Sequence, residues 1–147
     1  MMLHAGLKPP PRACGNISRM LSAGTEWIID AHGCRPDVLR SRAALESLFA
    51  LVIDDLRLRP VAAPVWHEFA GEGGITAVVL LSESHLCCHT FPESGFAAFN
   101  LYCCRPRAVW PWEAVLAERL GASTVHVRSE TRGLAPAAIP SRGRSAL

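Results

Sequence analysis

Apolar and polar positions change their spacing along the chain, and these changes predict its strands and helices. Six stretches have the apolar, β-branched or alternating content of strands. They span residues 25–32, 61–69, 75–81, 84–91, 96–104 and 125–128. Two other stretches repeat their apolar residues at helical spacing, from Arg35 to Leu56 and from Pro111 to Leu120. Gly121 is well placed to cap the second helix.

The order of these elements is strand, helix, four strands, helix and strand, and it predicts an α/β (α+β) fold. We expect a two-layer sandwich, in which a mostly antiparallel sheet carries both helices on one face. Pro64 argues for an edge position or an irregular start of the second strand, because proline cannot donate to the ladder. The other face of such a sheet stays uncovered unless a second protomer packs against it.

Length and composition fit one domain with flanking tails. The chain has 147 residues, half of them apolar, which suffices for one core. We assign the domain to residues 24–133 and expect flexible tails over 1–23 and 134–147. The N-terminal tail holds no apolar run long enough for a signal core or a membrane span, so we expect a cytoplasmic protein without a membrane partner. A formal charge of +2 is too mild to indicate a nucleic-acid partner.

Six cysteines raise the question of disulfides or zinc. Four of them form the adjacent pairs Cys87-Cys88 and Cys103-Cys104, and neighbouring side chains on a strand diverge instead of converging on one ion. The sequence has no C-x-x-C pair and no secretory pattern. We therefore expect reduced thiols and no bound metal, and metal analysis would test the alternative of a zinc module.

Reactive side chains are densest in one stretch, Leu81-Ser82-Glu83-Ser84-His85-Leu86-Cys87-Cys88-His89-Thr90-Phe91-Pro92-Glu93. The stretch holds hydroxyls, two imidazoles, two thiols and two carboxylates. An apolar run over 75–81 leads into it, so Glu83 and Ser84 stand where a buried strand ends and polar groups begin. Such a position is common for an active site.

This stretch resembles the processing and active site of the S-adenosylmethionine decarboxylases of the short prokaryotic type. The matching residues are Ser82-Glu83-Ser84-His85, His89-Thr90-Phe91-Pro92-Glu93, Gly95, Ala97-Ala98 and Cys104. A chance match at so many fixed positions is improbable. With its flanks, the resemblance covers about residues 24–133 of the chain.

The resemblance implies a proenzyme that cuts itself between Glu83 and Ser84. A serine hydroxyl can attack the preceding carbonyl to form an ester, and loss of the α-proton then eliminates the ester to dehydroalanine. Hydrolysis leaves a pyruvoyl group derived from Ser84, and no metal or diffusible cofactor is needed. By family analogy His89 takes the α-proton and the hydroxyl of Thr76 helps to hold the ester.

The same resemblance implies the groups that act on the substrate. The pyruvoyl carbonyl forms a Schiff base with a substrate amine and accepts electrons as CO2 leaves. Cys104 aligns with the family's proton donor, while Cys103 points to the opposite face and is expected to be a small buried hydrophobe. Phe69 and Phe91 are implied to sandwich the adenine, and Glu93 to bond the ribose hydroxyls.

We therefore expect a carboxy-lyase that decarboxylates S-adenosylmethionine for spermidine biosynthesis, working as a homodimer whose sites draw residues from both protomers. Departures from the family pattern at Thr76, Cys87, Phe91 and Asn100 leave open the same chemistry on arginine or ornithine. An uncleaved regulatory homologue is an alternative of another class. Strand alternation places Ser84 and His89 on opposite faces, so either the strand bends or the new chain end re-aims after cleavage.

Overall fold

The computed structural model describes residues 24–133, and the tails expected over 1–23 and 134–147 lie outside the described residues. In chain order the elements are β1 (Gly24–His32), α2 (Pro36–Leu39), α3 (Arg42–Asp55), β2 (Val65–Glu68), β3 (Ile75–Leu81), β4 (Ser84–Phe91), β5 (Phe96–Cys103), α4 (Trp112–Leu120) and β6 (Thr124–Arg132).

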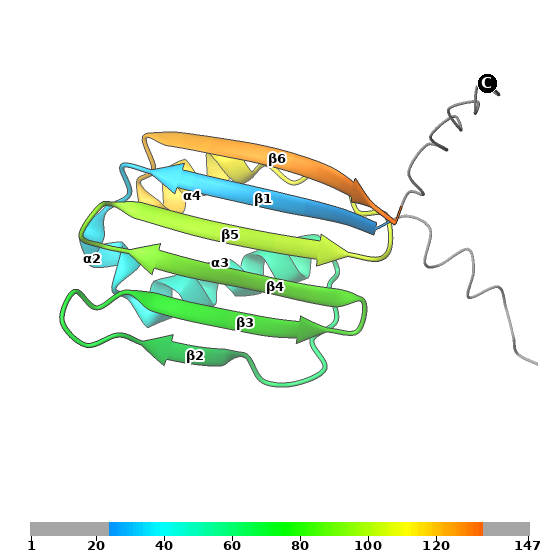
Figure 1. Cartoon of the computed structure of the whole chain (residues 1–147), viewed down its shortest axis with the longest axis horizontal. Coiled ribbons are helices and arrows are strands. Elements are labelled where there is room, and N and C mark those ends of the chain that lie inside the picture. Colours follow the sequence, from blue (N-terminus) through cyan, green and yellow to red (C-terminus); the bar gives the residue numbers. More distant parts are fainter. Residues whose placement is uncertain (1–23, 134–147) are drawn as a thin grey trace, which may run out of the picture.

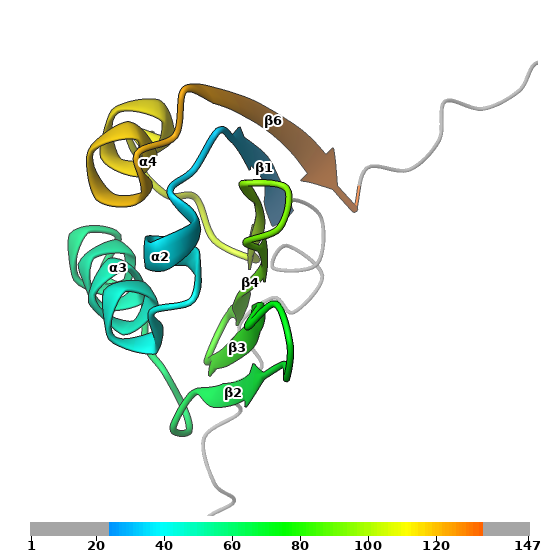
Figure 2. The same cartoon turned by 90° about the vertical axis from the view of Figure 1, so that its left-hand side faces the viewer.

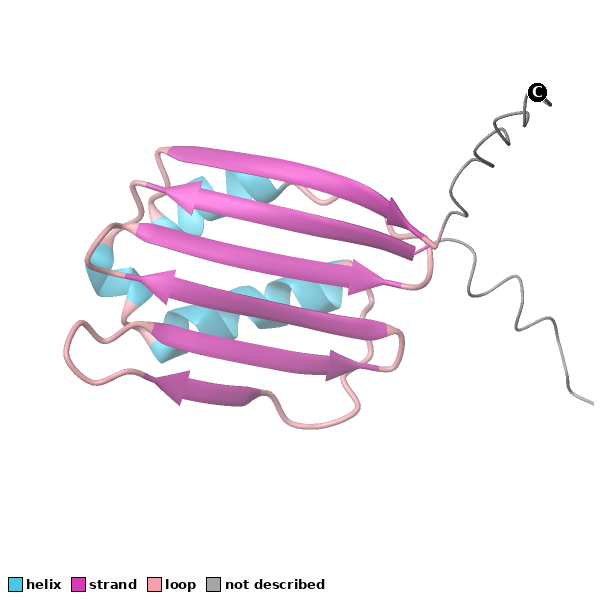
Figure 3. Ribbon diagram, viewed as in Figure 1, coloured by secondary structure: helices cyan, strands magenta, loops and turns pink. Residues whose placement is uncertain are grey.

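The strands form one six-stranded sheet in the order β2-β3-β4-β5-β1-β6, and every neighbouring pair is antiparallel. All three helices lie behind one face of this sheet (Figure 1). Seen from the side, helices and sheet make two layers (Figure 2), and the face turned to the viewer in Figure 3 carries no helix of the described chain. The two-layer sandwich expected from the sequence is confirmed.

The helix expected from Arg35 to Leu56 is wrong in one respect, because it is broken into α2 and α3. Ser41 has extended backbone angles, φ −89° and ψ 101°, and its hydroxyl accepts a 3.3 Å hydrogen bond from the Ala44 N–H. Serine is a favoured residue at such an N-cap, so α3 begins afresh there. The described residues therefore contain three helices instead of the expected two.

Two strand boundaries also differ from the expected ones. The strand expected over 61–69 is reduced to β2, which lies at the edge of the sheet, as Pro64 suggested. The strand expected over 125–128 is longer, because β6 pairs with the whole of β1, from Gly24↔Arg132 to His32↔Thr124. Backbone pairing across the full strand stabilises residues whose side chains alone do not predict a strand.

The core lies between the sheet and the helices. Its most buried side chains include Ile29, Leu86 and Leu101 from the strands and Leu45 and Leu116 from the helices. Burial of such side chains is the main favourable contribution to folding. It also fixes which side chains of the sheet face away from the helices.

One polar side chain, Thr90, is buried within the described range. Its hydroxyl accepts a 2.8 Å bond from the Ile75 N–H and donates a 2.9 Å bond to the Leu39 carbonyl. It thereby ties β4 to β3 and to the end of α2.

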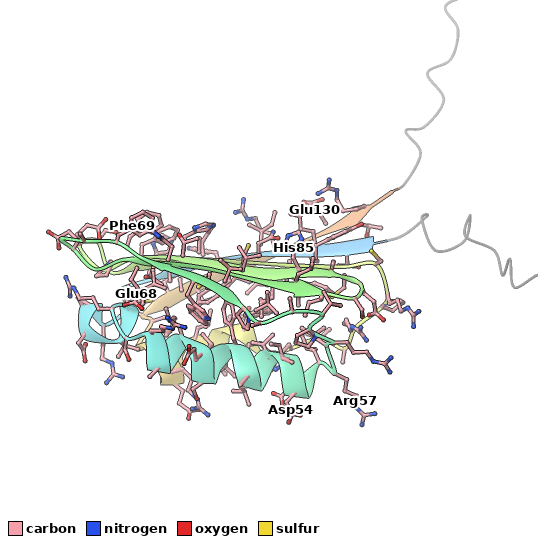
Figure 4. All side chains as sticks on the ribbon, turned by 90° about the horizontal axis from the view of Figure 1, so that it is seen from below. Asp54, Arg57, Glu68, Phe69, His85 and Glu130 are labelled. Carbon is pink, nitrogen blue, oxygen red and sulfur yellow. The ribbon has the colours of Figure 1, made fainter. Side chains whose placement is uncertain are left out.

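The outer face of the sheet is the one opposite the helices. On β4, Leu86, Cys88 and Thr90 are buried against the core, so the alternating residues, among them His85 and His89, face outward. Figure 4 shows Phe69 and His85 on this outer side, with α3 on the other. In the part of the chain that the structure describes, no helix is long and apolar enough to cross a membrane.

Candidate active site

A tight hairpin turn between β3 and β4 presents Glu83 and Ser84. Leu81 pairs with Ser84, so only Ser82 and Glu83 lie between the two strands. The Ser84 backbone has φ 153°, a conformation that residues with a side chain rarely adopt. Its hydroxyl oxygen is buried and has no hydrogen-bond partner among residues 24–133. A strained backbone and a buried free hydroxyl thus occur in the same serine.

The peptide carbonyl before Ser84 is held by the end of β5. The Cys104 N–H donates a 3.1 Å hydrogen bond to the Glu83 carbonyl oxygen. A donor at this oxygen polarises the carbonyl and can stabilise negative charge that develops on it. The Glu83 carbonyl is therefore prepared for attack by a neighbouring nucleophile.

Two arginines pair with the Glu83 carboxylate, one largely buried and one exposed. Arg107 forms an ion pair with one carboxylate oxygen, and Arg105 Nε lies 3.3 Å from the other. The Glu83 and Arg107 side chains are only 16% and 17% exposed, whereas Arg105 is 55% exposed. Sequence reasoning missed Arg107, because it lies beyond the motif in a loop without periodicity.

The two cysteines at the end of β5 have different surroundings. Cys103 is fully buried and is the register partner of Ser84. Burial raises the pKa of the Cys103 thiol, while its contacts with Arg107 and Ser84 act in the opposite direction. Cys104 is exposed, which places the two thiols on different sides as strand alternation predicts. The expectation of a buried Cys103 is confirmed.

A second group of candidate residues surrounds a cavity of about 320 Å³ at the other end of β4. Phe69, Glu72, Gly74, Thr76, His89, Thr90, Phe91 and Glu93 line it. Thr76 and His89 are register partners, and a 2.9 Å hydrogen bond joins Thr76 Oγ1 and His89 Nδ1. The structure thus brings the expected Thr76 and His89 together with the three expected binding residues, Phe69, Phe91 and Glu93.

Sequence reasoning missed Glu72 and Gly74 in the cavity wall, because they lie in a glycine-rich loop before β3 and outside the motif. Arg40 holds this turn by donating a 2.7 Å bond to the Glu72 carbonyl oxygen. A side chain on Gly74 would bring its Cβ to 2.6 Å from the Thr90 carbonyl oxygen, so the wall depends on glycine there. Glu72 adds a second carboxylate, beside Glu93, to a cavity with two phenyl rings.

The structure does not bring Ser84 and His89 together within one chain. His89 follows Ser84 by five positions on β4. At about 3.3 Å per residue this separates them by about 16 Å along the strand. Their strand partners also differ, because Ser84 pairs with the buried Cys103 and His89 with Thr76. Each chain therefore presents two separate half-sites, one at Ser84 and one at the cavity.

A hydrogen-bonded chain crosses the outer face beside Ser84. Asn100 Nδ2 donates a 2.9 Å bond to Glu26 Oε1, and Asn100 Oδ1 lies 2.9 Å from His85 Nε2. Because the amide nitrogen faces Glu26, the amide oxygen accepts from His85, which must carry its proton on Nε2. The hydrogen bond from Asn100 is the largest cause of the lowered Glu26 pKa, and Arg132 acts in the same direction.

Between Gly24 and Gly133, no three His, Cys, Asp or Glu side chains are grouped so that they could hold a metal ion. The cysteines in this range, Cys34, Cys87, Cys88, Cys103 and Cys104, are free thiols.

Comparisons with known proteins show which family the chain resembles. The family profile described as S-adenosylmethionine decarboxylase matches residues 25–133. A curated relative from Caldicellulosiruptor saccharolyticus, named S-adenosylmethionine decarboxylase proenzyme, is 35% identical over 119 residues, which cover 78% of this chain and 92% of the relative. Proteins of the same name from Moorella thermoacetica and Thermococcus kodakarensis are each 33% identical. They cover 78% and 80% of this chain, and 91% and 82% of their own length.

A solved structure also resembles the fold. The crystal structure of the adenosylmethionine decarboxylase from Aquifex aeolicus superposes with a TM-score of 0.64 at 23% identity. The match covers 78% of this chain and 94% of that one. It supports the arrangement of the sheet and helices.

Proposed function

The chain belongs to the S-adenosylmethionine decarboxylase family, and from this premise we propose that it cuts its own backbone between Glu83 and Ser84 and converts Ser84 into a pyruvoyl group. Its activity is the decarboxylation of S-adenosylmethionine, which makes it a lyase of polyamine biosynthesis. The relatives are named proenzymes, in line with self-processing. They do not favour arginine or ornithine as substrate, or a purely regulatory role.

The geometry of Ser84 carries the cleavage proposal. Its φ of 153° is unfavourable for a serine, and its buried hydroxyl has no partner within the described chain. Strain and an unsatisfied polar group both cost stability and are typical of functional sites. Both are removed when the bond before Ser84 breaks and the hydroxyl is consumed. Ser84 therefore fits the precursor of a pyruvoyl group.

The cleavage uses only protein groups, with His89 supplied by the second protomer of the dimer proposed below. Ser84 Oγ attacks the Glu83 carbonyl carbon, and the negative oxygen accepts the Cys104 N–H bond described above. The C–N bond then breaks, leaving an ester and a free Ser84 amine. His89, with Nδ1–H donated to Thr76, uses Nε2 to take the Ser84 α-proton. Glu83 leaves as a carboxylate, and residue 84 becomes dehydroalanine. Water hydrolyses the imine form of dehydroalanine to the pyruvoyl group and releases ammonia.

The mature site places residues around the substrate. The pyruvoyl group supplies an electron sink that binds the substrate amine and accepts the electron pair as CO2 leaves. Cys104 returns a proton to the substrate carbon. The phenyl rings of Phe69 and Phe91 contact the adenine, and Glu93 accepts hydrogen bonds from the ribose hydroxyls. The cavity that these residues share with His89 is their binding site.

The two half-sites support a homodimer. The outer face exposes large apolar side chains, including Val78 (41%), Leu80 (56%) and Phe91 (41%), and exposed apolar patches of this kind mark interfaces. A two-fold axis near the middle of β4 would place the Ser84 end of one chain against the His89 end of the other. His89 of the second protomer would then reach Ser84 of the first, whereas His89 of the first protomer is too far away.

The proposed compartment is the cytoplasm. The five cysteines between Cys34 and Cys104 are free, and two adjacent pairs remain unlinked. Such thiols persist under reducing conditions and are rare in secreted domains.

Intact mass spectrometry tests the proposed cleavage. The wild-type chain should yield the fragments 1–83 and 84–147, the second blocked at its N-terminus, whereas Ser84→Ala should remain one chain. Release of labelled CO2 from S-adenosylmethionine, arginine and ornithine is measured on both proteins. A wild-type chain that stays whole, or that acts on arginine but not on S-adenosylmethionine, contradicts the proposal.

A further inference from the structure

Unsatisfied buried polar atoms gather at one place in the structure. Among the described side chains, the two such atoms are Ser84 Oγ and Arg107 Nε. Cys103, the register partner of Ser84, interacts with both side chains, so Ser84 and Arg107 lie beside the same buried thiol. Buried polar groups are almost always hydrogen-bonded, and exceptions call for a functional explanation. An unsatisfied hydroxyl oxygen and an unsatisfied guanidinium nitrogen beside one thiol therefore point to chemistry at this position.

Arg107 holds the residue whose carbonyl is attacked. Its terminal nitrogen pairs with the Glu83 carboxylate, and both side chains are largely buried. The Glu83 carbonyl is at the same time bound by the Cys104 N–H. Glu83 is thus fixed at both its side chain and its main chain, while Ser84, the next residue, has the unfavourable φ. Without Arg107, only the exposed Arg105 would pair with the Glu83 side chain, and the hairpin turn could relax.

Arg105 pairs with the same carboxylate but in a different setting. It is 55% exposed, and its nitrogen lies 3.3 Å from Glu83. Exposed ion pairs contribute little, because water screens them and the long side chains lose entropy. The largely buried ion pair between Arg107 and Glu83 has little freedom to move, so it can fix the position of the Glu83 backbone. Arg105 is therefore a matched control on the same carboxylate.

We propose that Arg107 is a positioning residue for self-cleavage: it holds Glu83 so that the Ser84 hydroxyl faces the scissile carbonyl, and its charge favours the oxyanion formed on attack. The inference rests on the proposed cleavage at Ser84. The step concerned is the first one, in which the Oγ–C bond forms, the C–N bond breaks and the hydroxyl proton passes to the departing amine. Arg107 takes no part in the later loss of the α-proton, which belongs to His89.

The test uses full-length chains made by cell-free translation, so that cutting begins at a defined time. Arg107→Ala, Arg107→Lys, Arg105→Ala and His89→Ala are followed by intact mass, with and without hydroxylamine, which cleaves an ester but not a peptide bond. Loss of alignment slows Arg107→Ala at least about tenfold, Arg107→Lys recovers part of the rate, and Arg105→Ala stays within about twofold of wild type. Hydroxylamine speeds cutting of His89→Ala, which accumulates ester, but not of Arg107→Ala.

Three results overturn the inference. Arg107→Ala cuts itself at the wild-type rate, Arg105→Ala slows cutting as much as Arg107→Ala does, or hydroxylamine speeds the cutting of Arg107→Ala, which would show that its ester forms normally. Circular dichroism checks folding. If Arg107→Ala does not fold, Arg107→Lys is compared with Arg107→Gln, and equal cutting rates of these two overturn the role of the charge. A wild-type chain that remains uncut contradicts the proposed function instead, so the two failures are distinguishable.

Discussion

Thr76 and His89 face each other across β3 and β4, with Thr76 Oγ1 2.9 Å from His89 Nδ1. This bond orients the imidazole and, when Nδ1 carries the proton, leaves Nε2 free to act as a base. The role of Thr76 can therefore be tested separately from that of Ser84, the proposed pyruvoyl precursor.

Replacement of Thr76 by valine should slow self-cleavage at the ester stage. Valine keeps the shape but removes the oxygen, so the His89 ring loses its partner and its fixed tautomer. We expect formation of the blocked fragment to slow by about tenfold to a hundredfold, with an ester that hydroxylamine cleaves. Thr76→Ser retains the oxygen and is the control. Equal rates for Thr76→Val and Thr76→Ser would contradict this role.

Mixing of inactive protomers should restore activity. Ser84 and His89 are about 16 Å apart in one chain, so the proposed site takes Ser84 from one protomer and His89 from the other. Ser84→Ala and His89→Ala chains, inactive alone, each contribute an intact half-site when they are co-expressed. Each heterodimer of the two variants has one complete site of two, so purified heterodimers carry roughly half of the wild-type number of sites.

The measurement for this mixing experiment is CO2 release by the co-expressed chains, purified through a tag on each variant. Chains that carry both Ser84→Ala and His89→Ala, co-expressed with wild type, show how much activity one intact protomer gives. If the two single variants, when co-expressed, show no activity above background, the site is not shared between protomers.

The sequence predicted the order of the strands along the chain and the two layers, because apolar periodicity reports directly which face of each element is buried. It missed the break at Ser41, since the apolar residues of α2 and α3 keep helical spacing across it. It also underestimated β6, whose exposed polar residues are held by backbone pairing to β1. Local patterns do not contain such long-range backbone contacts.

The sequence predicted some residues of the candidate site and missed others. A motif identifies residues close together in sequence, so Ser84, His89 and Phe91 were found together. Arg107 and Glu72 reach the site from loops whose paths depend on the whole fold, and neither has a sequence signal. The separation of Ser84 from His89 followed from strand alternation, but the two half-sites became evident only from the register of β3, β4 and β5.

Replacement of Asn100 by aspartate should raise the pKa of Glu26. Asn100 now donates to the Glu26 carboxylate and lowers its pKa, whereas aspartate would place a second negative charge there. A lowered carboxyl pKa contributes stability above the ordinary value of 4.5, and this contribution is lost as the pH falls through the folded-state value. We expect Asn100→Asp to be less stable by about 1 kcal/mol at pH 7.

This destabilisation by Asn100→Asp is measured by urea unfolding of uncut Ser84→Ala chains, and it should shrink when the pH falls below 4.5, the ordinary value for glutamate. Carboxyl NMR titration of Glu26 gives the direction of the pKa change directly. Asn100→Ala, which removes the donor without adding charge, should show a smaller effect. A Glu26 pKa that is unchanged or lower in Asn100→Asp would refute the explanation.

Alkaline pH should destabilise the fold through its buried thiols. Burial raises the pKa of Cys88 from 9.0 to about 12, and burial also raises the pKa of Cys34, Cys87 and Cys103. A raised thiol pKa leaves stability intact below the unfolded value of 9.0, and stability falls as the pH rises toward the folded value, because only the unfolded thiol ionises. Each such thiol adds a slope of up to about 1.4 kcal/mol per pH unit.

Urea unfolding of the uncut Ser84→Ala chain from pH 7 to pH 11 measures this slope. Cys88→Ala removes one buried thiol and should lower the slope above pH 9.0, the ordinary thiol value, even though the smaller side chain lowers the stability at every pH. Cys104→Ala removes an exposed thiol and serves as the comparison variant. Because the comparison rests on slopes, a general loss of packing cannot produce the expected result. A Cys88→Ala slope as steep as that of the parent would mean that the Cys88 thiol ionises in the folded protein as easily as in the unfolded chain.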